Sequence, residues 1–210
     1  GTGHHYYYIG VNKIWLIVGG IFSALEPLAF LAMALFAVYM YRKGEKSHPN
    51  KIALFWTIGA SIVSFVGAGL LGFAHTLPQT NIYTHGTLVT AMHGHYAFWG
   101  AYAMIVLAII SYAMPNMTGR KLYDSTRGHM AFWLSNVGML GMTVAFGVAG
   151  VAQVYLERKM KMDFMDVQNE ISIHFVVLLL CASLFATGIT LYILEFIKYG
   201  KPTDEALIKE

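Results

Sequence analysis

Two histidines separated by a single glycine lie inside an apolar stretch of the sequence, in the motif Met92-His93-Gly94-His95-Tyr96. Each residue of an α-helix turns the side-chain direction by about 100°, so His93 and His95 point about 200° apart. They cannot bind one metal ion together, but each can bind a separate group on its own flank of the helix. Because neutral imidazole is a common ligand of heme iron, the motif predicts two heme ligands, with Gly94 leaving room for flat macrocycles. The alternative is that both histidines form hydrogen bonds between helices.

A second pair of histidines, His4 and His5, stands next to three tyrosines in the segment GHHYYY. Neighbouring imidazoles in an irregular segment can converge on one metal ion. Two ligands do not complete such a site, so at least one more must come from elsewhere. The pair could instead be a tag remnant or a surface anchor, and the tyrosines also fit an aromatic belt at a membrane interface.

An acidic residue, Glu26, stands within an apolar stretch, 21 residues after His5. A charged and unpaired carboxylate in hydrocarbon costs several kcal/mol, so Glu26 should be protonated, paired with a metal or facing water. Pro27 removes a backbone donor and predicts a kink beside the acid. A role in a metal site or in proton transfer follows, the alternative being a neutral glutamate hydrogen-bonded between helices.

The remaining histidines carry weaker signals. His85 precedes His93 by eight residues, about 2.2 helical turns, which places it at the outer membrane surface, where it could contact heme propionates or simply cap a helix. His48 and His129 are expected in solvated loops. His75 and His174, at helix ends, are expected as interfacial anchors.

The elements that must position these residues are five long apolar segments. The chain has 210 residues, of which 57% are hydrophobic and 12% charged, about half the charge of a typical soluble domain. The segments are 14–41, 52–74, 87–114, 130–156 and 171–194, with short loops between them. Each exceeds the roughly 20 residues that cross a bilayer as a helix, and Glu26 is their only formal charge. The sequence therefore predicts an all-α, polytopic membrane helix bundle and excludes a soluble enzyme, a nucleic-acid-binding module and a disordered protein.

The lysines and arginines predict an orientation. Ten lie in the segments 42–51, 115–129 and 198–210, and four lie on the opposite side of the predicted bundle. The positive-inside rule then places residues 1–10 outside the cytoplasm and the C-terminus inside. In a Gram-negative cell the outer side would be periplasmic. Because the chain opens at Gly1 without a methionine, we expect a single membrane domain over 1–210 that is the C-terminal part of a longer catalytic subunit.

The motifs together resemble the heme–copper oxidase superfamily, and within it the nitric oxide reductase branch. The stretch GTGHHYYYIG from Gly1 to Gly10 resembles the vicinal-histidine loop of the family. The stretch THGTLVTAMHGHYAFWGAY from Thr84 to Tyr102 resembles its tenth helix. The resemblance covers the whole chain, as the last five of twelve transmembrane helices, and is close to the large cytochrome b subunit of the cytochrome c-dependent enzymes.

This resemblance implies a role for each motif. His4 and His5 would be two of three histidine ligands of a non-heme iron, and Glu26 would be the acid near that iron, as a ligand or just outside its ligand shell. His93 would be the axial ligand of the high-spin heme b3, and His95 one axial ligand of the low-spin heme b. In the family, the second heme b ligand and the third histidine ligand of the iron lie on earlier helices, which this chain lacks.

The implied activity is the reduction of two nitric oxide molecules to nitrous oxide and water in a bacterial inner membrane. The implied partners are the N-terminal helices of the same subunit, a membrane-anchored cytochrome c subunit and the lipid bilayer. An oxygen-reducing terminal oxidase of the same superfamily, which would contain copper, is one alternative. A quinol-dependent nitric oxide reductase is another. A proton- or cation-coupled transporter is a third alternative, although a transport function would not explain the His-Gly-His motif at His93.

Overall fold

The computed structural model describes residues 3–44, 50–119 and 125–199, and all of its regular structure in these ranges is helical. Five segments are long and apolar enough to cross a membrane: Lys13–Lys43, Lys51–Thr76, Leu88–Thr118, Thr126–Lys159 and Ser172–Ile197. These five spans match the predicted segments in number and order. The prediction of an all-α, multi-pass membrane protein is therefore confirmed.

The described ranges contain fourteen helical elements, of which η1, α5 and α9 lie outside the five spans. In chain order they are η1 (Gly3–Tyr6), α1 (Lys13–Ala24), α2 (Glu26–Lys43), α3 (Lys51–Ser64), η2 (Phe65–Leu70), α4 (Leu71–Thr76), α5 (Pro78–Thr84), α6 (Leu88–Phe98), η3 (Trp99–Ala103), α7 (Met104–Thr118), α8 (Thr126–Val154), η4 (Tyr155–Lys159), α9 (Phe164–Glu170) and α10 (Ser172–Tyr199). The element η1 is a short 3₁₀ turn, whereas η2, η3 and η4 are π-helical turns. Such wide turns often occur at functional sites.

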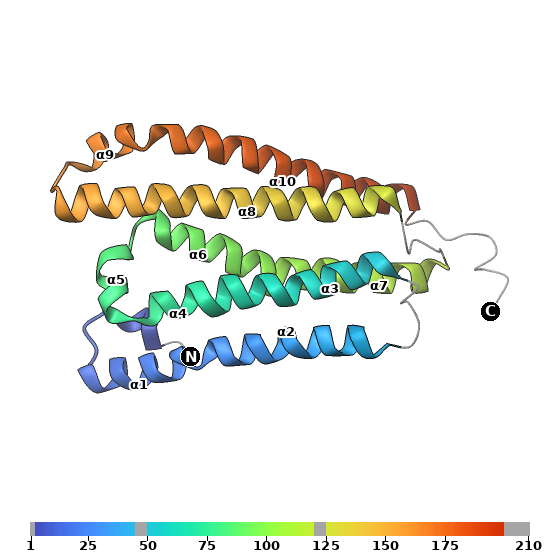
Figure 1. Ribbon diagram of the computed structural model, residues 1–210, viewed down its shortest axis with the longest axis horizontal. Coiled ribbons are helices and arrows are strands. Elements are labelled where there is room, and N and C mark those ends of the chain that lie inside the picture. Colours follow the sequence, from blue (N-terminus) through green and yellow to red (C-terminus); the bar gives the residue numbers. More distant parts are fainter. Residues whose placement is uncertain (1–2, 45–49, 120–124, 200–210) are drawn as a thin grey trace.

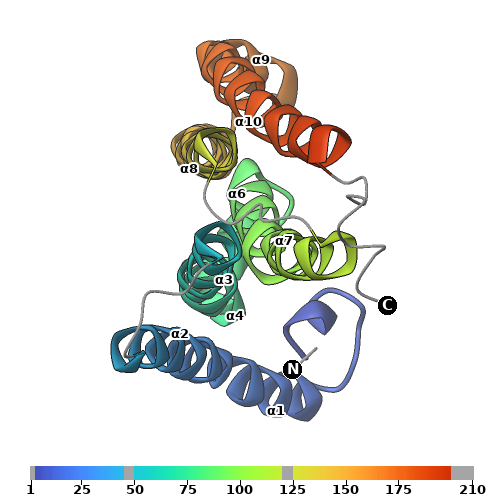
Figure 2. The same cartoon turned by 90° about the vertical axis from the view of Figure 1, so that its right-hand side faces the viewer.

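The five spans run side by side along the long axis of the molecule (Figure 1). Seen from the end, α10, α8, the α6–α7 rod, the α3–α4 rod and the α1–α2 rod follow one another (Figure 2). Each span packs mainly against its neighbours in the sequence. This arrangement follows from the short connections, which favour neighbouring antiparallel helices.

The core lies between the second, third, fourth and fifth spans. Trp56 and Met104 are fully buried, and the Trp56 ring makes edge-to-face contacts with Trp99, Phe132 and Tyr192 at centroid distances of 5.1–6.0 Å. Aromatic pairs in this geometry contribute about 0.5–1.5 kcal/mol each beyond the area they bury. This aromatic cluster joins four of the five spans.

Close packing of α8 on α10 depends on glycines that face the opposite backbone. A Cβ atom at Gly138 would overlap the backbone of Phe185, and one at Gly188 would overlap the backbone nitrogen of Ser135. Without side chains at these points the two helix axes can approach closely, as in other membrane bundles.

Three connections differ from the sequence prediction. The segment 77–84, expected as a loop, forms α5, because Pro78 occupies the first helical turn, where its fixed φ fits and its missing N–H is not needed. The segment 157–170, also expected as a loop, contains the end of η4 and α9. The third span continues past Pro115 to Thr118 and ends at Gly119, whose φ of 68° is left-handed.

Pro115 is accommodated by a side chain from the preceding span. Because proline has no N–H, the carbonyl of Ser111 four residues earlier loses its helical partner. The side-chain amide of Asn50 donates to this carbonyl at 2.9 Å, and Asn50 is itself buried. In hydrocarbon each backbone group must find such a partner, which explains how the helix passes the proline.

We predict that Gly188→Val lowers the stability of the α8–α10 pair. The new side chain meets the backbone near Ser135, which cannot move aside as a flexible side chain would, and such overpacking costs about 1–3 kcal/mol. The measurement is thermal unfolding followed by circular dichroism in lipid nanodiscs. Ala186→Val, at an exposed position on the same helix, is the matched control and should leave the midpoint nearly unchanged. Equal midpoints for both variants would contradict the packing argument.

Candidate functional site

The two histidines of α6 point toward different neighbouring spans. The His93 Nδ1 atom lies 2.9 Å from the carbonyl oxygen of Gly67, in the second span. The His95 ring stacks on Phe146 of the fourth span, with ring centroids 4.9 Å apart. The side chains of His93 and His95 therefore point in different directions, as expected for two residues that are two positions apart on a helix.

Both histidines are held in the same tautomer. The His95 Nδ1 atom lies 2.8 Å from the carbonyl of Ala91, just as that of His93 faces the carbonyl of Gly67. A carbonyl oxygen only accepts hydrogen bonds, so Nδ1 must donate in both rings, and Nε2 of the neutral ring carries a lone pair. An Nδ1–H bonded to a backbone carbonyl is the usual way in which a metal-binding histidine is oriented. Both side chains therefore meet the chemical requirement for an axial heme ligand.

A cavity of about 540 Å³ lies beside His95. Its size falls in the range of roughly 300–1,000 Å³ that is typical of small-molecule and cofactor sites. It is lined by Thr90, Ala91, Gly94, His95, Phe98, Trp99, Ala103 and Met139. No other part of the described chain comes within 4 Å of where a Cβ atom of Gly94 would lie. This mostly apolar cavity with one imidazole fits a flat apolar macrocycle such as heme.

On the other flank, three of the sequence-predicted residues are brought together. His5 and Glu26 both interact electrostatically with His93, although they come from η1 and from the first turn of α2. The expected kink at Pro27 is a break in the helix, since α1 ends at Ala24 and α2 begins at Glu26. The break places the carboxyl-bearing residue at the start of a new helix.

The described residues contain no group of three histidine, cysteine, aspartate or glutamate side chains close enough to hold a metal ion by themselves. The side chain of His4 lies outside the part of the chain that the structure describes. The non-heme iron site predicted at His4, His5 and Glu26 therefore stays a prediction.

His75 belongs to this neighbourhood, which the sequence did not predict. It was expected as an interfacial anchor, but it is only 6% exposed, and its ring stacks on that of His93 with centroids 5.0 Å apart. Its Nδ1 atom faces the carbonyl of Leu71 at 3.0 Å. Nothing in the spacing of His75 and His93 could have revealed the contact, because a short helix and two turns separate them in the chain.

Two tyrosines hold the vicinal-histidine segment against the end of the second span and against α5. The Tyr7 hydroxyl donates to the carbonyl of Thr76, and the Tyr8 hydroxyl donates to Oδ1 of Asn81 at 2.8 Å. The Asn81 amide in turn donates to the carbonyl of His75 at 2.8 Å. Burial and the neighbouring Tyr8 raise the pKa of the Tyr7 phenol above its ordinary value, so Tyr7 remains a donor at neutral pH. These bonds set the position of η1 relative to His75.

His85 lies at the same end of the bundle, at the C-terminus of α5. Its ring packs against Tyr8 with centroids 4.2 Å apart, and its carbonyl accepts a hydrogen bond from Arg158 at 3.5 Å. The predicted contact with heme propionates is not tested by this arrangement. The location beside the vicinal-histidine segment is compatible with it.

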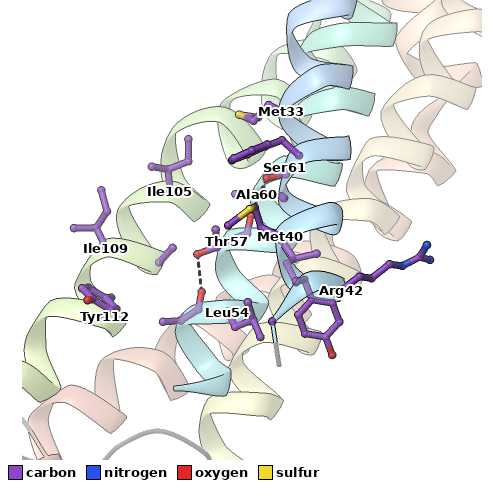
Figure 3. Close-up of a pocket in the computed structure, with 17 residues that line it drawn as sticks. Met33, Met40, Arg42, Leu54, Thr57, Ala60, Ser61, Ile105, Ile109 and Tyr112 are labelled. Carbon is purple, nitrogen blue, oxygen red and sulfur yellow. Dashed lines mark hydrogen bonds between the residues drawn. The ribbon is translucent and has the colours of Figure 1, made fainter. Parts of the chain in front are cut away.

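A larger cavity, of about 1,000 Å³, lies elsewhere, between α2, α3 and α7 (Figure 3). Its walls are mainly apolar, with Met33, Met40, Ile105 and Ile109 among them. The Thr57 hydroxyl donates a hydrogen bond to the carbonyl of Ala53. Arg42 is the only charged residue among the described residues that line it. The described lining contains no histidine, cysteine or carboxylate side chain, so size alone does not identify the functional site.

Comparison with known proteins gives one family and two relatives. The family model described as cytochrome C and quinol oxidase polypeptide I matches residues 1–190. The chain is 44% identical over 209 residues to a nitric oxide reductase subunit of Stutzerimonas stutzeri, an alignment covering 96% of this chain and 44% of that protein. It is 33% identical over 86 residues to cytochrome c oxidase subunit 1 of Corynebacterium diphtheriae, covering 41% of this chain and 15% of that protein. The chain thus spans less than half the length of these relatives.

We predict that Tyr7→Phe loosens the segment that carries the vicinal histidines. The variant loses the hydrogen bond to Thr76, a loss of about 1 kcal/mol, and hydrogen exchange of the amides at residues 5–9 should accelerate. Hydrogen-exchange mass spectrometry of the reconstituted protein measures the effect. Tyr6→Phe is the control, because Tyr6 is exposed.

The Tyr7 bond should also weaken in alkali. A phenol whose folded-state pKa is raised contributes stability below its unfolded value near 10, and that contribution is lost as the pH rises through the raised pKa. Protection of residues 5–9 should therefore fall above about pH 10 in the parent protein and not in Tyr7→Phe. Equal protection in the parent, Tyr7→Phe and Tyr6→Phe proteins would contradict the assignment.

Proposed function

The chain belongs to the cytochrome c and quinol oxidase polypeptide I family, and we propose that it forms the last five helices of a nitric oxide reductase catalytic subunit. The reaction joins two nitric oxide molecules with two electrons and two protons to give nitrous oxide and water. The observation that carries the proposal is the pair His93 and His95, opposed on one helix and both presenting Nε2 as a ligand atom. The 44% identity to the nitric oxide reductase subunit of Stutzerimonas stutzeri supports the choice of reaction.

We assign heme b3 to His93 and heme b to His95. When bound, the two hemes and a non-heme iron supply the redox chemistry and the coordination of nitric oxide. The chain contributes the orientation of its ligand rings, which Gly67 and Ala91 fix through their carbonyls. The mostly apolar lining of the cavity beside His95 would suit the macrocycle of heme b.

We assign the non-heme iron to His4 and His5, with further ligands from outside this chain. Glu26 lies close enough to His93 for an electrostatic interaction, so it can act on the same reaction centre. Its carboxylate would either ligate the iron or stabilise its positive charge. It could also hold the protons that the reaction consumes. His85 would contact the propionates of heme b3 at the outer surface.

The proposed setting is a bacterial inner membrane, with residues 1–10 on the periplasmic side and the C-terminus in the cytoplasm. The excess of lysine and arginine in the sequence segments 42–51, 115–129 and 198–210 supports this orientation. The N-terminal helices of the same subunit would supply the second heme b ligand and the third histidine of the iron site. A membrane-anchored cytochrome c subunit would deliver the electrons.

The relative from Corynebacterium diphtheriae favours one second candidate, an oxygen-reducing terminal oxidase. Metal analysis of the purified complex separates the two functions. A nitric oxide reductase should contain non-heme iron and no copper, whereas an oxidase of this type should contain copper in the corresponding position.

We predict that the two histidines of α6 can be separated by spectroscopy. His93→Ala in the whole enzyme should remove the high-spin heme signal and keep the low-spin one, because the two imidazole rings would bind hemes on different flanks of the helix. His95→Ala should do the reverse. Electron paramagnetic resonance and visible absorption spectra measure both signals, and loss of the same signal in both variants would refute the assignment.

We predict that Glu26→Ala retains both hemes but lowers nitric oxide turnover by about 100-fold or more, the usual effect of removing a group that transfers protons. Heme content from absorption spectra and nitric oxide consumption at an electrode are the two measurements. Glu170→Ala, at an exposed position in α9, is the matched control and should retain turnover. Unchanged turnover in Glu26→Ala would exclude a catalytic role.

A further inference from the structure

A third, small cavity lies at the end of the bundle opposite to η1 and His75, where α3 and α8 begin and α7 and α10 end; Figure 1 shows these helix ends. Its volume is about 20 Å³, and a cavity needs roughly 10–15 Å³ to hold one water molecule. The polar side chains in its wall are Ser111, Ser125, Tyr192 and Glu195, while its other lining residues carry no polar side-chain atom.

Each hydroxyl group around this cavity already donates its hydrogen to another group of the protein. The Tyr192 hydroxyl donates to the carbonyl of Leu107 at 2.9 Å. A hydroxyl has one hydrogen, so in the 3.0 Å contact between Tyr192 and Ser111 the donor must be Ser111. The Ser125 hydroxyl donates to Oε1 of Glu195 and accepts from the backbone N–H of Gly128 at 2.9 Å. No hydroxyl hydrogen remains to point into the cavity.

The carboxyl group of Glu195 leaves one oxygen without a hydrogen bond. Glu195 is only 8% exposed, and its Oε2 atom is buried with no hydrogen-bond partner among the described residues. Nη1 of Arg127 lies 3.8 Å from Oε2, too far for a hydrogen bond. A buried acceptor of this kind normally has a donor, supplied by the protein or by ordered water.

We propose that this cavity binds one water molecule, which donates one hydrogen to Oε2 of Glu195 and the other to Oγ of Ser111. The cavity presents acceptors only, and water supplies the two donors that the protein lacks. The Arg127 guanidinium, which is partly exposed, lies on another side of the same carboxyl group, at 3.8 Å from Oε2. The water would thereby connect the fifth span to the third, and Asn50, through the Ser111 carbonyl, extends the network to the start of α3.

The test is infrared difference spectroscopy of the whole protein in lipid membranes, with H₂¹⁸O exchanged for H₂¹⁶O. A bound water should give an isotope-shifted O–H stretching band. Glu195→Gln should lose this band, because its amide points a donor into the cavity. Ser111→Ala should move the band to higher frequency, because one hydrogen loses its acceptor. Glu170→Gln makes the same chemical change at an exposed position and should leave the band in place.

A double-mutant cycle gives an independent readout. Because the two side chains would share one water, the thermal shifts caused by Glu195→Gln and Ser111→Ala should not add. Additive shifts, together with a spectrum in which no isotope-sensitive band depends on Glu195, would show that the cavity is dry and overturn the proposal. A carboxylic acid C=O band that disappears in Glu195→Gln would also overturn it. Such a band would mean that Glu195 is protonated and carries the donor hydrogen that the proposal assigns to water. None of these results depends on the proposed enzymatic reaction.

Discussion

The hydrogen bond between Nδ1 of His93 and the carbonyl of Gly67 is the interaction on which the candidate site depends. It joins the third span to the wide π-turn of the second, and it decides which nitrogen of the imidazole is left to bind a metal. The His75 ring, stacked on the same imidazole, restricts its plane from the second span as well. A ligand fixed in both tautomer and direction needs little reorganisation when it binds iron.

The membrane imposes a related constraint on the backbone. A carbonyl that loses its helical partner in hydrocarbon must find another donor, because no bulk water is available there. The Ser111 carbonyl, which Pro115 leaves without a helical donor, accepts from the Asn50 amide. At the opposite end of the bundle, the Thr76 carbonyl finds the Tyr7 hydroxyl. The same kind of polar contact therefore holds the candidate site at one end and the small cavity at the other.

The size of a cavity and its chemical content are unrelated in this bundle. The cavity of about 1,000 Å³ between α2, α3 and α7 has a mainly apolar lining. The cavity of about 540 Å³ beside His95 contains an imidazole whose free nitrogen can bind iron. The smallest of the three contains a buried carboxylate oxygen without a donor. The polar groups that line each cavity, and whether each has a hydrogen-bond partner, therefore distinguish the three cavities more clearly than their volumes do.

The sequence by itself determined the five spans and the divergence of His93 and His95, because both depend only on hydrophobic length and on the local helical period. It also located the helix break beside Glu26, since proline acts within one turn. Only the tertiary structure brought His5, His75 and Glu26 to His93, and Glu195 to the cavity beside Ser111. These contacts join residues from different spans, and the apolar periodicity of a helix does not specify which of its faces meets which neighbour. The short helices α5 and α9 were missed for a similar reason, because they are too short to show a hydrophobic period of their own.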